Sequence, residues 1–480
     1  MSLKTEASKG FLWVAVERFG QQFIQATIFI ILARLLTPED FGLVAMIIIF
    51  FALSQSFIDS GMGQALIREK EITVEDRSTV FWFNLLLAVV FYILLYFSAP
   101  WIAAFYEQPQ LIALTRVMGL SVIFFGIAIV QRSEMTQRLE FKKQAFAQIP
   151  AVIIAGITSV TIAYLDYGVW ALAFQYLLLA FVSSVILWIQ QPVQIHFSFY
   201  KKSFKRLFGF GYKLLLSGLL NTLYNHIYKL IIGKFFAAST LGYYTQAQNV
   251  KNMASKNMVG IIQKVTYPLL SKTIDNPERM KQGYRQVIKS SSFIIFPAIV
   301  LLFIFAEPIM TYILGKQWQA AAPYLQIMCI YGTLYHLHSI NLNVLKVLGR
   351  SDLFLKLEII KKTNTTIAIV IGLQFGIWGL LVGQVFTSYI ALFINSYYTA
   401  KFLNYPIFDQ IKDVLQVLVL AIPMAIIAVT VQFLFPVHSI WLLLLFLIGS
   451  GLIYLLSNLL YKNDTFNLFF ELIAPYLPKK

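Results

Sequence analysis

Polar side chains fall on single helical faces of two segments that are otherwise apolar. The two sets are Arg18, Gln21 and Gln25 in residues 10–33, and Asn221, Asn225 and Lys229 in residues 211–235. Because residues three, four, seven or eight positions apart lie on the same side of an α-helix, each set forms a stripe. Such a stripe can hydrogen-bond a polar ligand, and polar packing between helices is the alternative interpretation.

Two further apolar segments carry charged groups in their interiors. They are residues 41–64, with Asp59, and residues 241–265, with Lys251, Asn252 and Lys256. A charge within a membrane span is costly, so it faces a partner or a water-filled cavity. Lys251 lies ~15 Å into its segment, near the middle of a bilayer. Since basic groups prevail, we predict that the four stripes line one cavity for an anionic substrate such as a phosphate or pyrophosphate.

Arg18 and Asp59 lie at similar depths in the first two apolar segments. An unpaired carboxylate at that depth would be strongly unfavourable or would take up a proton. We therefore expect these two side chains to lie close together.

The composition indicates a protein with many membrane spans. The chain of 480 residues is 59% hydrophobic and 12% charged, with a mean hydropathy of +0.72. Apolar runs such as residues 80–105 and 440–461 reach the length of ~20 residues that a membrane helix needs. The spans must be helical because lipid offers no partners to backbone polar groups.

The apolar runs predict an all-α integral membrane fold with about fourteen transmembrane helices. The predicted spans lie near residues 10–33, 41–64, 79–99, 111–131, 147–165, 168–190, 211–235, 241–265, 290–311, 323–346, 358–374, 376–398, 412–434 and 439–461. The connections between them are short and leave no room for a soluble domain.

Basic residues gather in the connections that follow the even-numbered spans. The connection after the sixth span, for example, holds Lys201, Lys202, Lys205 and Arg206. The positive-inside rule then places both termini in the cytoplasm. These connections also account for the net charge of +16, so the charge does not indicate a nucleic-acid partner.

Two pairs of segments recur at nearly equal intervals. The stretch "ILARLLTPEDFGLVA" at 31–45 aligns with "IIGKFFAASTLGYYT" at 231–245, 200 residues later, and "YGVWAL" at 167–172 aligns with "FGIWGL" at 375–380, 208 residues later. Such a repeat indicates an internal duplication. Six spans in each copy return the chain to its starting side, so the copies are parallel. We predict a six-helix lobe at 1–200, a second at 201–400, and an added two-helix hairpin with a cytoplasmic tail at 401–480.

The sequence predicts no catalytic residues, cofactor or metal site. His336 and His338 are two positions apart and point to different helical faces, so we interpret them as packed side chains. The single cysteine, Cys329, excludes an internal disulfide framework. We find no glycine-rich nucleotide-binding loop.

Six stretches of the chain carry a resemblance to a known family. They are "LARLLTPEDFGLVAM" (32–46), "RLEFKKQA" (138–145), "YGVWALAFQYL" (167–177), "FGYKLLLSGLLN" (210–221), "IIGKFFAASTLGYYTQAQ" (231–248) and "GKQW" (315–318). These stretches resemble motifs of polysaccharide flippases in the multidrug/oligosaccharidyl-lipid/polysaccharide exporter superfamily. The resemblance implies two six-helix lobes around a central cavity to which the first two spans of each lobe contribute. It transfers no invariant substrate residue to this chain.

The same resemblance implies a function. It is the translocation of undecaprenyl-pyrophosphate-linked oligosaccharide outward across a bacterial inner membrane, with membrane lipids, a polysaccharide polymerase and export machinery as partners. Two alternatives stay open. A drug/cation antiporter of the same fold would prefer an acidic cavity, and a non-transporting membrane scaffold would need no buried polar stripe.

Overall fold

The computed structural model describes residues 20, 22–255, 259, 270, 273 and 276–461. Wherever these residues form regular secondary structure, it is helical, which confirms the predicted all-α class. The chain forms two compact units, Met1–Gly242 and Tyr243–Lys480. The predicted lobes divide instead at residues 200 and 201, and those boundaries stay a prediction.

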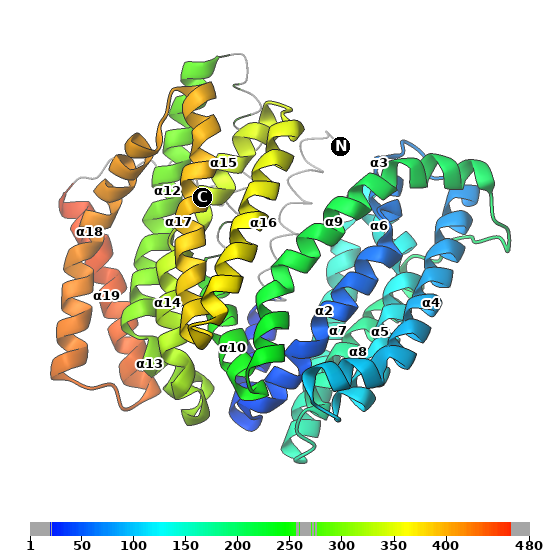
Figure 1. The fold of residues 1–480 in the computed structure, drawn as a ribbon, viewed down its shortest axis with the longest axis horizontal. Coiled ribbons are helices and arrows are strands. Elements are labelled where there is room, and N and C mark those ends of the chain that lie inside the picture. The colour runs from blue at the N-terminus through cyan, green and yellow to red at the C-terminus, as the bar shows by residue number, and fades with distance from the viewer. Residues whose placement is uncertain are drawn as a thin grey trace, which may run out of the picture. The chain divides into compact units, whose positions relative to one another are not determined.

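Helices of the first unit run in close succession (Figure 1). After the helix Gln22–Leu35 come α2 (Pro38–Asp59), α3 (Met62–Arg68), α4 (Val74–Tyr106), α5 (Leu111–Ile127), α6 (Ile129–Gln137), α7 (Phe141–Tyr164), α8 (Trp170–Gln190) and α9 (Lys201–Phe235). The chain bends by 42° between α5 and α6, within the predicted span 111–131.

The second unit follows a similar order of helices (Figure 1). After α10 (Ala238–Ala254), whose first residues belong to the first unit, come α12 (Pro277–Ile304), α13 (Ala306–Pro308), a π-helix (Ile309–Leu314), a 3₁₀-helix (Lys316–Ala321), α14 (Ala322–Gly332), α15 (Tyr335–Val347), α16 (Ser351–Leu373), α17 (Gly376–Leu403), α18 (Ile407–Leu434) and α19 (Ile440–Leu460). The predicted span 323–346 is interrupted between α14 and α15.

Two long helices begin with the same local device. In the sequences "TPED" (37–40) and "TVED" (73–76), the threonine hydroxyl accepts a hydrogen bond from the aspartate backbone amide. The aspartate carboxylate in turn accepts one from the threonine amide, at 2.9 Å before α2 and 3.4 Å before α4. This reciprocal capping box satisfies backbone donors at a helix start. It fixes where both helices begin.

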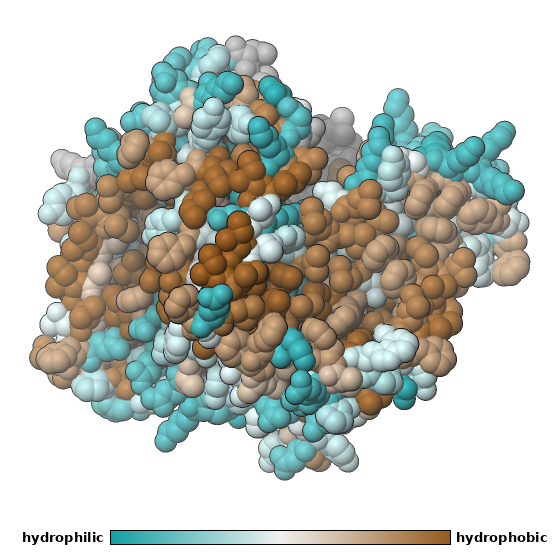
Figure 2. Space-filling model, viewed as in Figure 1, coloured by the Kyte–Doolittle hydropathy of each residue, from teal (hydrophilic) through white to brown (hydrophobic). Residues whose placement is uncertain are grey.

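Eight of the described helices are long and apolar enough to cross a membrane, and the bent pair α5–α6 would add a ninth. The eight are α2, α4, α7, α8, α12, α17, α18 and α19. Other helices within predicted spans are shorter or more polar, as the charged residues of α16 illustrate. The count of fourteen therefore stays a prediction. Figure 2 shows hydrophobic residues over the middle of each unit and hydrophilic ones toward its ends.

The structure corrects the predicted connection at residues 201–206. These residues form the first turns of α9, which begins ten residues before the predicted span at 211. A helix can continue past the hydrocarbon because basic side chains remain hydrated there. The basic residues thus lie on a rigid element that continues into the span.

Backbone contacts at the starts of α2 and α10 support the predicted duplication. A Cβ added to Gly42 would lie 1.8 Å from the Ala238 carbonyl oxygen, and one added to Gly242 would lie 1.9 Å from the Pro38 carbonyl oxygen. At the repeat interval of 200, Gly42 corresponds to Gly242 and Pro38 to Ala238. The contact is therefore reciprocal, and both positions require glycine because no larger residue fits so close to a backbone.

Helix α9 packs within the first unit through a second close approach. A Cβ on Gly61 would lie 2.3 Å from the Gly211 carbonyl oxygen. Gly61 has φ of +70° in the break between α2 and α3, a backbone conformation that glycine adopts without strain. This contact holds α9, which carries predicted site residues, against α2 and α3.

Candidate functional site

The predicted amide stripe of α9 lies on an exposed face. Asn221 and Asn225 are exposed, and Lys229 is half-buried. The neighbouring Thr222 instead packs on α2, where its hydroxyl lies 3.1 Å from the Ser56 hydroxyl. Asn221 and Asn225 thus remain exposed on either side of the contact that Thr222 makes with α2.

Gln25 is exposed on the helix Gln22–Leu35, also within the first unit. The other predicted residues of the first span, Arg18 and Gln21, lie outside the described residues, as does Lys256. The proximity of Arg18 to Asp59 therefore stays a prediction.

Asp59 has a structural role that the sequence analysis missed. As the last residue of α2, it accepts a hydrogen bond at 3.2 Å from the Gly63 amide in the first turn of α3. Among the described residues, the cation that acts electrostatically on it is Arg132 of α6. The sequence "DSGMG" at 59–63 signals such a turn, because an aspartate before glycines commonly bonds a nearby backbone amide.

Lys251 is enclosed within the second unit, where its side chain is packed against α14. Only 5% of the residue is exposed, and its amine lies 4.7 Å from the centre of the Tyr331 ring. A Cβ on Gly332 would approach the Lys251 Cδ atom to 3.2 Å, so the stem lies along the helix backbone. Asn252, the next residue, is half-buried. In this conformation Lys251 faces an aromatic ring rather than open space.

The charged residues of α16 form a stripe that the sequence analysis missed. Lys361 forms an ion pair with Glu358, and the Lys362 amine lies 4.0 Å from the same carboxylate. All three side chains are half-buried. Their spacing of three and four residues inside the predicted span 358–374 was a readable signal.

The two histidines of α15 are packed, as the sequence indicated. His336 lies 2.8 Å from the Ser292 hydroxyl, and His338 lies 3.0 Å from the Ser388 hydroxyl and 3.2 Å from the Asn395 amide. Across the described residues, no group of three or more histidine, cysteine or acidic side chains could hold a metal ion.

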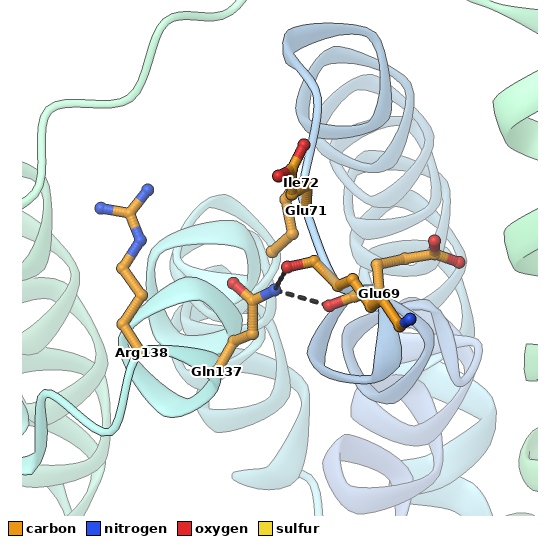
Figure 3. A pocket seen from close by; sticks show the side chains of 6 residues that line it. Glu69, Glu71, Ile72, Gln137 and Arg138 are labelled. Atoms are coloured by element: carbon orange, nitrogen blue, oxygen red, sulfur yellow. Dashed lines mark hydrogen bonds between the residues drawn. The ribbon is translucent and has the colours of Figure 1, made fainter. Parts of the chain in front are cut away.

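Basic connections predicted for one side of the membrane meet at one end of the first unit. Gln137, at the end of α6, donates hydrogen bonds to the backbone oxygens of Glu69 and Lys70, at 2.6 and 3.3 Å (Figure 3). These residues line an open groove of about 550 Å³ with Glu71, Ile72 and Arg138. The connections after the second and fourth predicted spans are thus neighbours, in line with the alternating topology.

Arg206 joins the connection after the sixth predicted span to the same end. It binds Glu69 at 3.2 Å and Asp76 at 2.5 Å. Asp76 lies in the first turn of α4, ahead of the apolar run that begins at Val80. Burial alone would raise the pKa of the Asp76 carboxyl, but hydrogen bonds from Ser203, Arg206 and Thr73 outweigh burial and lower the pKa.

Comparison with known families identifies the chain. The family described as polysaccharide biosynthesis protein matches residues 31–323, more than half of the sequence. The chain belongs to the polysaccharide biosynthesis protein family. This confirms the resemblance drawn from the sequence motifs.

Two relatives of this chain are biosynthesis proteins for teichuronic acid and lipopolysaccharide. The teichuronic acid biosynthesis protein TuaB of Bacillus subtilis (strain 168) is 26% identical over 355 residues, covering 73% of each chain. The lipopolysaccharide biosynthesis protein WzxC of Escherichia coli (strain K12) is 25% identical over 411 residues, covering 82% of each chain.

A solved structure extends the comparison to the fold. The lipid II flippase MurJ, in an inward closed conformation, superposes with a TM-score of 0.76 at 16% sequence identity. The match covers 94% of this chain and 99% of MurJ. This member of the polysaccharide biosynthesis protein family therefore has a MurJ-like fold.

Proposed function

We propose that this chain is a flippase that moves undecaprenyl-pyrophosphate-linked oligosaccharide outward across the bacterial inner membrane for surface polysaccharide export. Its family and its two relatives in polysaccharide biosynthesis support the substrate class. The MurJ-like fold supports translocation rather than enzyme catalysis. Membrane lipids, a polysaccharide polymerase and export machinery are the proposed partners.

The exposed amide stripe of α9 is the observation that carries this proposal. A sugar headgroup cannot cross hydrocarbon unless the protein replaces its water. Asn221 and Asn225 present exposed amides on α9, beside the point where Thr222 contacts α2. Amide groups both donate and accept hydrogen bonds, which suits sugar hydroxyls of varied geometry.

The proposed substrate contacts divide by chemistry. Amides meet the sugars, lysines meet the pyrophosphate, and Arg18 and Asp59 lie toward the cytoplasmic mouth. The full proposed set is Arg18, Gln21, Gln25, Asp59, Asn221, Asn225, Lys229, Lys251, Asn252 and Lys256. Phosphate oxygens make short, charge-assisted hydrogen bonds with lysine.

The enclosed position of Lys251 fits alternating access. A cavity that opens to one side of the membrane at a time requires at least two conformations. In the present one, Lys251 lies over Tyr331 of α14. A phosphate contact requires a second state in which α10 and α14 separate at this point.

Lys251 variants test the proposal. We expect Lys251→Arg to restore glycan export to a deletion strain, Lys251→Ala to restore it partly and Lys251→Glu not at all, at matched membrane abundance. Loss of one charge-assisted bond costs about 1.5–3 kcal/mol, or roughly a 10- to 150-fold loss of affinity in a dry site. Full export by Lys251→Glu would exclude the phosphate contact. Equal failure of all three with poor abundance would assign Lys251 to packing.

The two alternative functions predict different cellular outcomes. A flippase deletion strain should accumulate lipid-linked oligosaccharide on the cytoplasmic side. Deleting an antiporter should instead change drug or cation sensitivity without accumulation. If the chain is a scaffold, every stably folded Lys251 variant should complement the deletion strain equally well.

Topology gives an independent test. We propose that both termini are cytoplasmic, so a reporter fused at Asn276 should signal the cytoplasm and one at Gln317 the opposite side. The meeting of basic connections at one end of the first unit supports this arrangement. Signals from the same side for both fusions would overturn it.

A further inference from the structure

A short basic segment that ends in the first turns of α9 combines exposed aromatic and lysine side chains. This segment, residues 196–205, is called here the basic strap. Phe197 is 88% exposed and Phe199 is also exposed. Lys201, Lys202 and Lys205 are exposed on the first turns of α9. An exposed phenylalanine is unfavourable in water and is stabilised when an apolar environment covers it.

Hydrogen bonds fix the basic strap to the start of α4. The His196 amide donates to the Ser78 hydroxyl at 2.8 Å, and the Tyr200 amide donates to the Thr79 hydroxyl at 3.2 Å. The strap is therefore held at a defined position on the first unit rather than hanging from it.

Trp82 adds two contacts that set the depth of the strap. Its indole nitrogen donates a hydrogen bond to the His196 carbonyl at 2.9 Å. Its ring packs edge to face on the Phe197 ring, with the ring centres 4.7 Å apart. The apolar run of α4 begins at Val80, so these contacts place the strap where the hydrocarbon of a membrane begins. Tryptophan is typical of that level because one end of its ring is apolar and the other is polar.

The charges of the strap are available to a ligand. Arg206, the next basic residue, is neutralised by Glu69 and Asp76. By contrast, Lys201, Lys202 and Lys205 form no ion pair with the described part of the chain. Three lysines beside a phenylalanine at the membrane surface match a lipid with a negative headgroup and an acyl chain.

We propose that the basic strap is a binding site for anionic phospholipids of the leaflet in which it lies. The lysines contact the headgroup phosphates, and Phe197 inserts at the boundary between headgroups and acyl chains. This goes beyond the proposed function, because the lipid bound here anchors the start of α9 and is not transported.

The test measures lipid binding to the purified full chain in neutral detergent. Phosphatidylglycerol and phosphatidylcholine are titrated separately, and bound lipid is counted by native mass spectrometry. The variant Lys201→Gln/Lys202→Gln/Lys205→Gln should lose about fivefold in phosphatidylglycerol affinity for each lysine, or about 100-fold altogether. Its weaker affinity for phosphatidylcholine should not change.

A matched control removes three exposed lysines elsewhere: Lys356→Gln/Lys401→Gln/Lys412→Gln. It should keep most of the phosphatidylglycerol affinity. Equal loss in both triple variants would reduce the effect to general charge attraction and overturn the proposal. Displacement of phosphatidylglycerol by inorganic pyrophosphate at equal concentration would assign the site to the transported headgroup and also overturn it.

Phe197→Ser tests the insertion while every charge is kept. Because Ser78, Thr79 and Trp82 are unchanged, the strap should hold its position, and a single sharp elution peak checks the fold. We expect about tenfold weaker binding of both lipids. Unchanged binding would contradict insertion of Phe197. None of these readouts depends on transport, so they can fail or succeed separately from the proposed function.

Discussion

Two arginines occupy matching places in the two units but find their carboxylates on different elements. Arg77 at the start of α4 pairs with Glu134 of α6. Arg285 lies 208 residues later, the interval of the second sequence match, in the first turns of α12. It binds Asp413 of α18 through two hydrogen bonds of 2.7 and 2.9 Å.

Both carboxylates are buried, and each binds further partners besides its arginine. Glu134 also meets Arg138 at 3.8 Å and Gln191 at 3.3 Å, and Asp413 also meets Tyr405 at 2.6 Å and Lys289 at 3.2 Å. The arginines differ in exposure, since the side chain of Arg77 is 17% exposed and that of Arg285 is 46% exposed.

The difference shows how the second unit accommodates its added hairpin. At the same interval of 208 residues, the position that corresponds to Glu134 of α6 falls on α15. Helix α15 has no acidic residue, so it offers Arg285 no carboxylate like the one that Glu134 offers Arg77. The hairpin of α18 and α19 supplies the carboxylate instead. The arginine that ties helices together within the first unit therefore ties the added hairpin to the second.

Removing Glu134 should have the largest effect. Glu134→Ala leaves Arg77 mostly buried without its carboxylate, at a cost of about 3–5 kcal/mol. We expect a marked fall in folded yield and in the apparent melting temperature of the purified protein. Glu134→Gln, which keeps hydrogen-bonding capacity, is the control and should fall between. Native-like stability of the alanine variant would show that Arg77 rehydrates freely.

Asp413→Asn should have a smaller, local effect. Arg285 and Lys289 are more exposed and can turn to water, so we expect a loss of about 1.5–3 kcal/mol. Hydrogen exchange should rise in α18 and α19 but not in α4 or α6. A uniform rise over both units would refute separate docking of the hairpin.

The smallest effect concerns the pH dependence that Asp76, the residue before Arg77, gives to stability. Its pKa is lowered in the folded chain, so its contribution to stability is complete above the unfolded value of about 3.9 and disappears as pH falls through the lower folded pKa. We expect a loss below about 1 kcal/mol, because Arg206 is half-exposed. Asp76→Asn should flatten the stability profile below about pH 4, measured by thermal unfolding. An unchanged profile would contradict this assignment.

Features encoded locally could be predicted from the sequence. The predicted spans 168–190 and 439–461 correspond to α8 and α19 within two residues at each end. Apolar length and glycine-rich or capped ends determine such limits. The beginning of α9 was missed because helix propensity continues through residues that hydropathy assigns to a connection.

Features that depend on distant partners could not be predicted. Nothing near Lys251 in the sequence announces that Tyr331 and Gly332 will enclose it. The pairing of Arg77 with Glu134 likewise requires that α4 and α6 be neighbours in space. The stripe on α16 is different, because the spacing of Glu358, Lys361 and Lys362 is visible in the sequence itself.

The reciprocal contact of Gly42 and Gly242 bears on how such a chain could arise. A contact in which each partner presents the same surface is the signature of a two-fold symmetric homodimer. In an ancestral protein of half this length, a single glycine position would have occupied both sides of this backbone contact when two copies paired. Gene fusion would then have preserved the contact while each half diverged. One ancestral substitution thus accounts for two glycines that now lie 200 residues apart.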